Sequence, residues 1–540
     1  MFRPPRPGII RVFAFLLLSL SLAYVGLGQA QSAPPSSAPA ATQQKPDQGS
    51  SVRPDSKNDD NKAKPSAGGN DADSGQDKSS NQDNSSDQEK PDDDKSAKPD
   101  SKTTETKITP QQAEQLFHEV DTILDFASKD TDLPIKHGVK RRLINRDEVV
   151  SYLKKNMAED KDVQRLRRTE LVLKKFGLLP KDFNLQSFLV DLLEEQVAGY
   201  YDAKTKTVNL LDWVSPELQR PVLAHELTHA LQDQNFGLDK WLKKGSDDLD
   251  SKRNLTPDDI TKDENSEARQ AVVEGQAMVT LLDYMLAPMH RNVSDSPEIV
   301  DMLNEDMQTG TPDSVQFKNA PIFLKESLTF PYRYGVEFEA EVLRAQGKQK
   351  AFTGPFQNPP RTSREIMEPK TYLAGEHIAP LPLPDFKKIF KDYERFDIGA
   401  IGEFDVDILA EQYAGKEVAH HIYPNWRGGY YYSVHAKGDP QGMLGLVFVS
   451  RWASAKAAEE FAGVYAHGMA ERYKNLEAAP GNNLPANLKD LRTLGGDHTW
   501  KTPEGDIVIA VKGDTVLVTE SLNSGITEQF RKAVLASTAQ

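Results

Sequence analysis

The sequence predicts an α+β protein, in which a mainly helical domain with a short β-hairpin precedes a smaller α+β module. Apolar residues recur at helical spacing from position 108 towards 378, interrupted by alternating β-formers around a polar turn at 199–211. After the Pro-rich stretch 379–384, short alternating runs dominate and a single helix is expected at 454–473. We therefore expect the second module to place one helix on an antiparallel sheet.

Composition divides the chain into four segments. Residues 1–30 combine early arginines, a short apolar run and the small residues of Gly28-Gln29-Ala30, a pattern typical of a signal peptide. Residues 31–106 contain Val52 as their sole large apolar residue, so they cannot bury enough surface to fold and are expected to form a disordered polar linker. The helical domain then spans 107–378 and the α+β module 379–540.

Charge and cysteine content exclude several classes of function. The chain has 540 residues, a net charge of −15 and no cysteine. Disulfides, thiolate metal sites and thiol nucleophiles are therefore excluded, and the negative charge argues against a nucleic-acid partner. No segment after the signal is apolar enough to cross a bilayer. We expect an exported protein, periplasmic or extracellular, unless an uncleaved signal anchors it to the membrane.

Helices are expected in order along the first domain. Thr109-Pro110 has the pattern of an N-cap followed by a proline in the first turn. The remaining helices expected from apolar spacing span 149–157, 163–176, 188–198, 266–286, 324–343 and 364–367. In the second module, strands are expected at 429–435 and 443–449, and hairpins between 498 and 519.

One further helix, opened at Pro221 and closed by Gly237, carries the pattern His225-Glu226-x-x-His229. Residues four apart project from the same helix face, so both imidazoles can hold one Zn²⁺. Glu226 can then act as general base on a water at the metal. The pattern predicts a site for one zinc ion per chain.

A catalytic zinc usually has three protein ligands, and the third is missing from this helix. We expect Glu274, on the helix 266–286, to supply it, because the adjacent Gly275 allows a close approach that we expect to involve the metal helix. Glu267, seven residues earlier on the same face, is the alternative, either as a ligand or beside the ligands. Asp233 could orient a ligand imidazole through a hydrogen bond.

Substrate contacts are less sharply defined by the sequence. By analogy with zinc peptidases, the strand Val208-Asn209-Leu210 is expected to be an edge strand that binds an extended peptide by strand addition. An additional donor should stabilise the oxyanion of the reaction. The candidates are Tyr200, Tyr201, Tyr284, Tyr332 and His290.

These motifs resemble a little-characterised group of exported bacterial zinc metallopeptidases, gluzincin-like (HExxH…EGxA), in which two His and a Glu hold the metal. The matching stretches lie at 195–202, 225–234, 273–277, 330–335 and 359–363, within about 171–372. The resemblance implies a zincin-like metallopeptidase domain, zinc bound by His225, His229 and Glu274, and a protein or peptide substrate. It also shows a departure: Met278 stands where thermolysin-like enzymes place an Asp, four residues after the third ligand.

Two classes of function follow from the residues. The favoured one is a zinc-dependent metallopeptidase that hydrolyses peptide bonds of extracytoplasmic proteins or peptides through an activated water. The alternative is a non-catalytic envelope protein with a structural metal and a partner-binding C-terminal module. Structural zinc sites usually employ Cys, which this chain lacks, so the first is favoured.

Overall fold

The computed structural model describes residues 107–157, 160–196, 199–243, 255–309, 314–480 and 487–535. The predicted signal peptide and linker lie outside these residues. The described part belongs to one compact unit, and its helices and sheets confirm the α+β class.

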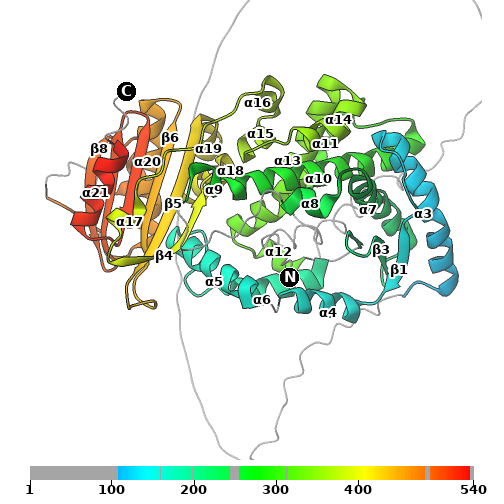
Figure 1. Cartoon of the computed structure of the whole chain (residues 1–540), viewed down its shortest axis with the longest axis horizontal. Helices are drawn as coiled ribbons and strands as arrows, with labels where there is room; N and C mark the ends of the chain where they lie inside the picture. Colours follow the sequence, from blue (N-terminus) through cyan, green and yellow to red (C-terminus); the bar gives the residue numbers. More distant parts are fainter. Residues whose placement is uncertain are drawn as a thin grey trace, which may run out of the picture. The chain divides into compact units, whose positions relative to one another are not determined.

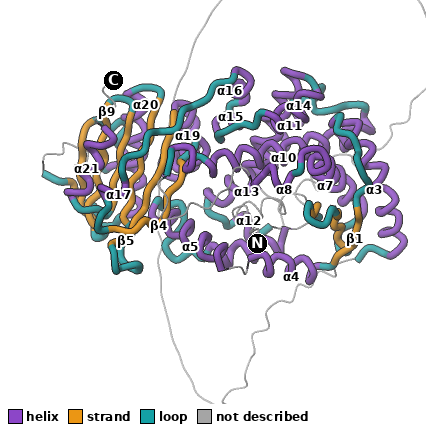
Figure 2. Tube along the Cα trace, in the orientation of Figure 1, coloured by secondary structure: helices purple, strands orange, loops and turns teal. Residues whose placement is uncertain are grey.

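The first part of the unit is almost entirely helical (Figures 1 and 2). Its helices are α3 Pro110–Thr131, α4 Arg146–Met157, α5 Asp160–Lys175, α6 Leu185–Gln196, α7 Pro216–Phe236, α8 Leu238–Lys243, α9 Pro257–Ile260, α10 Lys262–Leu286, η1 Ala287–Met289, α11 Glu298–Thr309, α12 Val315–Lys318, α13 Ile322–Gln346, α14 Lys348–Gln357, α15 Ser363–Met367 and α16 Pro369–Ala374. The N-cap predicted at Thr109 is confirmed, because its side chain accepts a hydrogen bond from the backbone of Gln112 in a capping box. Helix α10 is the central element, since it packs against both α7 and α13.

A small three-stranded sheet lies beside α7. Its strands are β1 Lys140–Ile144, β2 Tyr200–Asp202 and β3 Thr207–Leu211, in the order β1-β3-β2. The predicted hairpin is present as β2 and β3, which pair antiparallel. Strand β1 joins β3 in parallel and was not expected, because its sequence Lys-Arg-Arg-Leu-Ile has almost no apolar alternation.

The second part is built on a seven-stranded antiparallel sheet with the order β4-β5-β6-β10-β9-β8-β7. Its strands are β4 Tyr393–Ala400, β5 Trp426–Ala436, β6 Gly445–Trp452, β7 Glu477–Ala478, β8 Gly496–Thr502, β9 Gly505–Lys512 and β10 Thr515–Glu520. Its helices are α17 Phe386–Ile389, α18 Glu403–Ala414, α19 Lys416–Ile422, η2 Tyr423–Asn425, α20 Ala455–Arg472, η3 Leu488–Asp490 and α21 Ser524–Leu535.

Both faces of this sheet are covered by helices. Successive residues of β6 point to opposite faces, so Phe448 packs with α20 while Val447 and Val449 belong to a second core. Phe530 of α21 lies in that second core. The expectation of a single helix on the sheet is therefore wrong: α20 covers one face, and α17 and α21 cover the other.

The helical part and the sheet share a hydrophobic core. Phe176, directly after α5, makes edge-to-face contacts with Tyr431 of β5 and Phe448 of β6. Arg364 of α15 pairs with Glu403 of α18 at 2.6 Å. The described residues on the two sides of the predicted boundary at 378/379 pack together. The division into two domains at that position stays a prediction.

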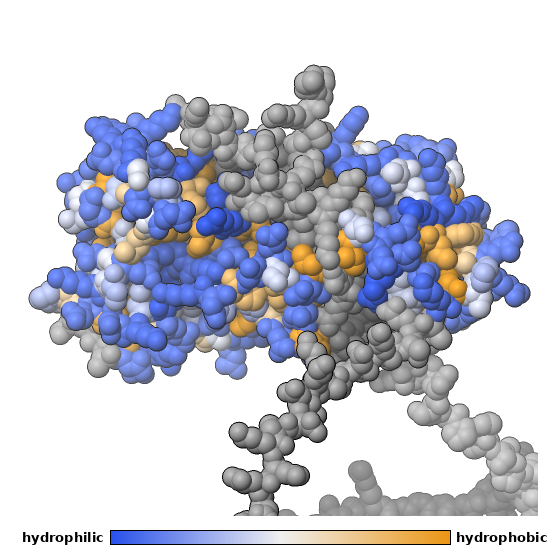
Figure 3. All heavy atoms as spheres, turned by 90° about the horizontal axis from the view of Figure 1, so that it is seen from below, coloured by the Kyte–Doolittle hydropathy of each residue, from blue (hydrophilic) through white to orange (hydrophobic). Residues whose placement is uncertain are grey.

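The surface view in Figure 3 shows a largely hydrophilic face with scattered hydrophobic residues. This agrees with a chain whose charged residues make up 27% of its length. Among the helices that the structure describes, none is both long enough and apolar enough to cross a bilayer.

Candidate metal centre

Helix α7 carries two of the three candidate metal donors. It begins at Pro216 and ends at Gly237, whose φ of +68° suits a residue without a side chain. The expected start at Pro221 is wrong, because Pro221 lies inside the helix and the helix begins one turn earlier. The added turn contains Gln219, whose side chain bonds the backbone N–H and C=O of Leu211 and so ties α7 to β3.

Three buried side chains meet between α7 and α10. Nε2 of His225 lies 3.0 Å from Nε2 of His229. Glu274 Oε2 lies 3.3 Å from the first of these nitrogens and 3.4 Å from the second. The structure thus brings together His225, His229 and Glu274 as a group that could hold a metal ion.

The donor set fits a zinc ion. Three donors bound at about 2.0–2.2 Å with tetrahedral angles are about 3.3 Å apart, close to the separations seen here. Glu274 is fully buried, and within the described residues its carboxylate oxygens receive no regular hydrogen bond. Burial raises the pKa of Glu274, but the two imidazoles outweigh this effect and lower it, so the carboxylate stays ionised. A buried anion that faces two imidazole nitrogens indicates a place for a cation.

Glu226 lies beside this group, although it is not one of the three donors. Its Oε2 accepts a hydrogen bond of 2.7 Å from the backbone N–H of Tyr201 in β2. Burial raises the pKa of Glu226, whereas the imidazoles of His225 and His229 oppose that rise. A carboxylate with a raised pKa and a fixed orientation is suited to accept a proton.

The imidazole of His229 is held by Gln232, and the expected partner Asp233 has other contacts. His229 Nδ1 lies 2.9 Å from Gln232 Oε1. Asp233 instead accepts hydrogen bonds from the Tyr201 hydroxyl at 2.9 Å and from the backbone N–H of Leu238, and pairs with Lys206. The prediction missed Gln232, because amide side chains follow no metal-site spacing.

The five candidates for an oxyanion donor have different surroundings in the structure. Tyr332 of α13 is buried, and its ring lies nearly parallel to that of His225, with centroids 6.3 Å apart. Burial, and then the charges of Glu274 and Glu226, raise the pKa of Tyr332 well above its ordinary value, so its hydroxyl remains a donor. Tyr284 instead packs edge-to-face on Phe126.

The other candidates have different surroundings. Tyr201 bonds Asp233 through its hydroxyl, Tyr200 pairs with Asn209 in the small sheet, and His290 is an exposed residue after η1. Of the five, Tyr332 is therefore the residue placed against a candidate metal donor.

Gly275 does allow a close helix contact. The neighbouring helix is α13, so the expectation that it would be α7 is wrong. A Cβ atom at Gly275 would lie 2.9 Å from Cα of Gly335 and closer still to its carbonyl group. Consecutive helix residues are rotated by about 100°, so Glu274 faces α7 while Gly275 faces α13. Helix α10 is thus fixed between the helix with the imidazoles and the helix with Tyr332.

Comparisons with known proteins add little to this geometry. No family model and no curated protein matches the chain. One solved structure, from Chloroflexus aurantiacus and described provisionally as a hydrolase with a novel fold, is similar to it at 16% identity and a TM-score of 0.32. The similarity covers 50% of this chain and 92% of that one. A likeness of this size assigns no role to any residue of the site.

The expected substrate strand is not an edge strand. Val208 pairs with Arg141 of β1 on one side and with Tyr201 of β2 on the other, and Asn209 is likewise paired on both sides. Leu210 also pairs with β1. Strand addition needs a free edge, so the expectation is wrong for Val208 and Asn209 and stays a prediction for Leu210, which among the described strands pairs with β1 alone. The edge of the small sheet next to Glu226 is formed by β2.

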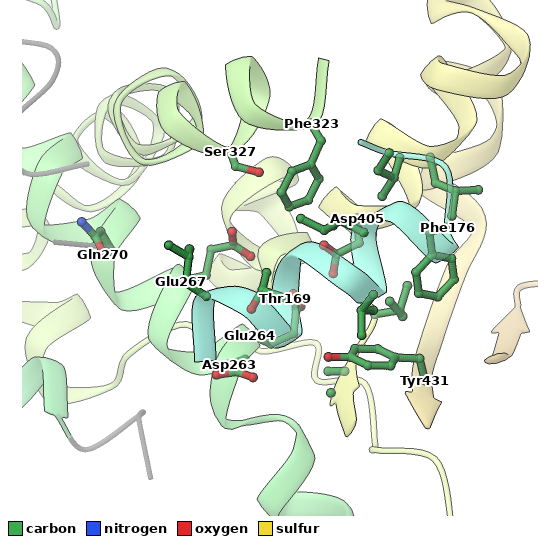
Figure 4. A pocket seen from close by; sticks show the side chains of 18 of the residues that line it. Thr169, Phe176, Asp263, Glu264, Glu267, Gln270, Phe323, Ser327, Asp405 and Tyr431 are labelled. Atoms are coloured by element: carbon green, nitrogen blue, oxygen red, sulfur yellow. The ribbon is translucent and has the colours of Figure 1, made fainter. Parts of the chain in front are cut away.

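Glu267 lies in a separate pocket, shown in Figure 4. This cavity of about 240 Å³ lies between α5, α10, α13, α18, the end of β4 and β5. It has apolar walls such as Phe323 and Leu409, together with several acidic residues. None of the three donors lines it, and Glu267 is two turns of α10 before Glu274. Within the described residues, His225, His229 and Glu274 form the only group with metal-binding geometry.

Proposed function

We propose that the protein is a zinc-dependent metallopeptidase that hydrolyses peptide bonds of proteins or peptides outside the cytoplasm. The observation that carries the proposal is the group of three buried donors, with Glu226 directly after the first of them in the helix. Structural zinc sites usually have four protein ligands, whereas catalytic sites have three and an open position. The described residues supply three, which favours catalysis over a structural metal in an envelope protein.

Each residue has a defined role in this proposal. His225, His229 and Glu274 would hold the ion, which would supply Lewis-acid activation of a water and of the substrate carbonyl. Glu226 takes the proton of the attacking water and delivers it to the leaving amine. The N–H of Tyr201 keeps the Glu226 carboxylate in place, and the Tyr332 hydroxyl donates a hydrogen bond to the developing oxyanion.

The substitution Glu226→Gln tests this assignment, because it keeps the size of the side chain and removes the base. The purified variant should bind about one zinc per chain, as wild type does, while casein cleavage falls by about 10²–10⁴-fold. Glu217→Gln, at an exposed position of the same helix, is the matched control and should keep full activity. Cleavage that survives Glu226→Gln would refute the role of this residue. A zinc-loaded wild type that cleaves no peptide would instead support the envelope-protein alternative.

A further inference from the structure

We propose that Gln232 and Gln276 are positioning residues that fix the tautomer and ring orientation of His229, a task usually performed in zinc sites by a carboxylate or a backbone carbonyl. Both glutamines are fully buried. The inference rests on the metal centre of the proposed function and concerns how the protein holds one of its ligands.

The hydrogen bonds of Gln232 determine which end of its amide faces His229. Gln232 Nε2 donates to the backbone carbonyl of Val273 and to Gln276 Oε1, both at 3.0 Å. An amide nitrogen only donates and an amide oxygen only accepts, so Gln232 Oε1 is the atom that faces the imidazole. Nδ1 of His229 must therefore donate its hydrogen to Gln232 Oε1, and Nε2 is the ring atom that faces His225 and Glu274.

Gln276 is oriented in turn by a backbone group. Its Nε2 donates to the carbonyl of Ala351 in α14 at 3.0 Å, which leaves Gln276 Oε1 to face Gln232. A main-chain carbonyl inside a helix cannot turn round, so the direction of every bond in the chain is set from that end. Every donor therefore points the same way, from His229 on α7 through Gln232 and Gln276 to the carbonyl of Ala351 in α14.

The hydrogen bonds through Gln232 and Gln276 orient the His229 imidazole without placing a charged group against it. Glu339 of α13 interacts with Gln276, and burial raises the pKa of Glu339 well above its ordinary value, which favours its uncharged form. Asp233, the carboxylate next to Gln232 in sequence, is bound to Tyr201 and Lys206 instead. The second imidazole differs from the first, since His225 Nδ1 has no hydrogen-bond partner among the described residues.

Replacing each glutamine by methionine tests these hydrogen bonds, because the methionine side chain has a similar length and no amide. The full-length variants Gln232→Met, Gln276→Met and the double variant are compared by competition for zinc with a chelator. Gln232→Met should weaken zinc binding about 10–100-fold. Gln276→Met should weaken it less, and should have no further effect in the Gln232→Met background, because Gln276 acts only through Gln232.

Gln234→Met is the matched control on the same helix. Gln234 bonds the backbone of Lys136 and His137 and makes no contact with an imidazole, so this variant should bind zinc as wild type does. Urea unfolding of the metal-free proteins identifies any variant that is simply unfolded.

A spectroscopic measurement separates positioning from a general loss of structure. In the cobalt(II)-loaded protein, the N–H protons of the two ligand imidazoles give shifted and exchangeable proton resonances. One of them should exchange slowly with solvent, because Gln232 holds it, and this slow signal should be lost in Gln232→Met. A slow signal that persists, or equal effects of Gln276→Met in both backgrounds, would overturn the inference.

Failure of the inference and failure of the proposed function are distinguishable. If zinc binds with the expected dependence on both glutamines but no peptide is cleaved, the peptidase proposal fails and the positioning role stands. If peptides are cleaved and Gln232→Met binds zinc as wild type does, the positioning role alone fails. A wild type that binds no metal overturns both.

Discussion

The contact between Gly275 and Gly335 offers a direct test of how the fold sets the geometry of the site. In Gly275→Ala, the new methyl group would lie 2.9 Å from Cα of Gly335, with the carbonyl of Gly335 nearer still. Ordinary contacts between carbon atoms are about 3.5–4.0 Å. Helices α10 and α13 must therefore separate by about 1 Å, because the obstacle is main chain on both sides and no side chain can move away.

The expected loss of stability follows from this displacement. Overpacking of a core costs about 1–3 kcal/mol, and a clash with main chain belongs at the upper end or beyond it. Alanine is about 1 kcal/mol more favourable than glycine inside a helix, which offsets part of the loss. We expect the free energy of unfolding to fall by about 2–3 kcal/mol. Zinc affinity should fall as well, because Glu274 precedes Gly275 and moves with the same turn of α10.

The assay is equilibrium urea unfolding of the metal-free protein, together with zinc competition on the folded protein. Gly525→Ala provides the control, since Gly525 also lies in a helix and a Cβ atom there would meet only Oδ1 of Asn523 at 3.3 Å. That variant should not lose stability, and it should gain at most about 1 kcal/mol from the helix propensity of alanine. If Gly275→Ala is as stable as wild type and binds zinc with unchanged affinity, the proposed link between this helix contact and the site is refuted.

Two further predictions concern the reaction and the effect of pH. Tyr332→Phe should lower kcat by about 10²–10³-fold and leave zinc binding unchanged, whereas Tyr284→Phe should change neither quantity. A fall in zinc affinity would instead give Tyr332 a structural role. Burial, and then the charges of Glu326 and Glu411, raise the pKa of Asp407 from 3.8 to about 7, so the folded state holds a proton that the unfolded chain has already lost. Wild-type stability should therefore decline between about pH 4 and 7, and urea unfolding should show a smaller decline for Asp407→Asn. An identical pH dependence of the two proteins would contradict this account.

The local rules of helices made much of the site predictable from the sequence. The spacing of His225 and His229 requires that they share one helix face, and the structure places their Nε2 atoms together. The glycine after Glu274 predicts a close helix contact there, and Glu274 does lie with the imidazoles. A glycine indicates a close neighbour without identifying the helix, and here that neighbour is α13.

The remaining features depend on contacts between distant segments. Strand β3 could not be recognised as a central strand, because its partner β1 is a charged five-residue segment far away in the sequence. Gln232 and Gln276 lie 44 positions apart in the sequence, and their side chains can form a hydrogen bond only when α7 and α10 are packed together. Tyr332 differs from the other tyrosines only through the crossing of α10 and α13.

The charge of Glu274 leads to a last prediction, on removal of the metal. This carboxylate is fully buried, and its Oε2 lies 3.3 Å from Nε2 of His225 and 3.4 Å from Nε2 of His229, where a bound metal ion would join all three. Zinc at 100 times its dissociation constant should stabilise wild type by about 2.7 kcal/mol. Glu274→Gln removes a charged donor, so the stability of this variant should gain nothing from zinc. Glu267→Gln should respond to zinc as wild type does, because Glu267 lies in the separate pocket. Urea unfolding with zinc and with a chelator measures all three proteins, and a zinc response retained by Glu274→Gln would remove Glu274 from the donor set.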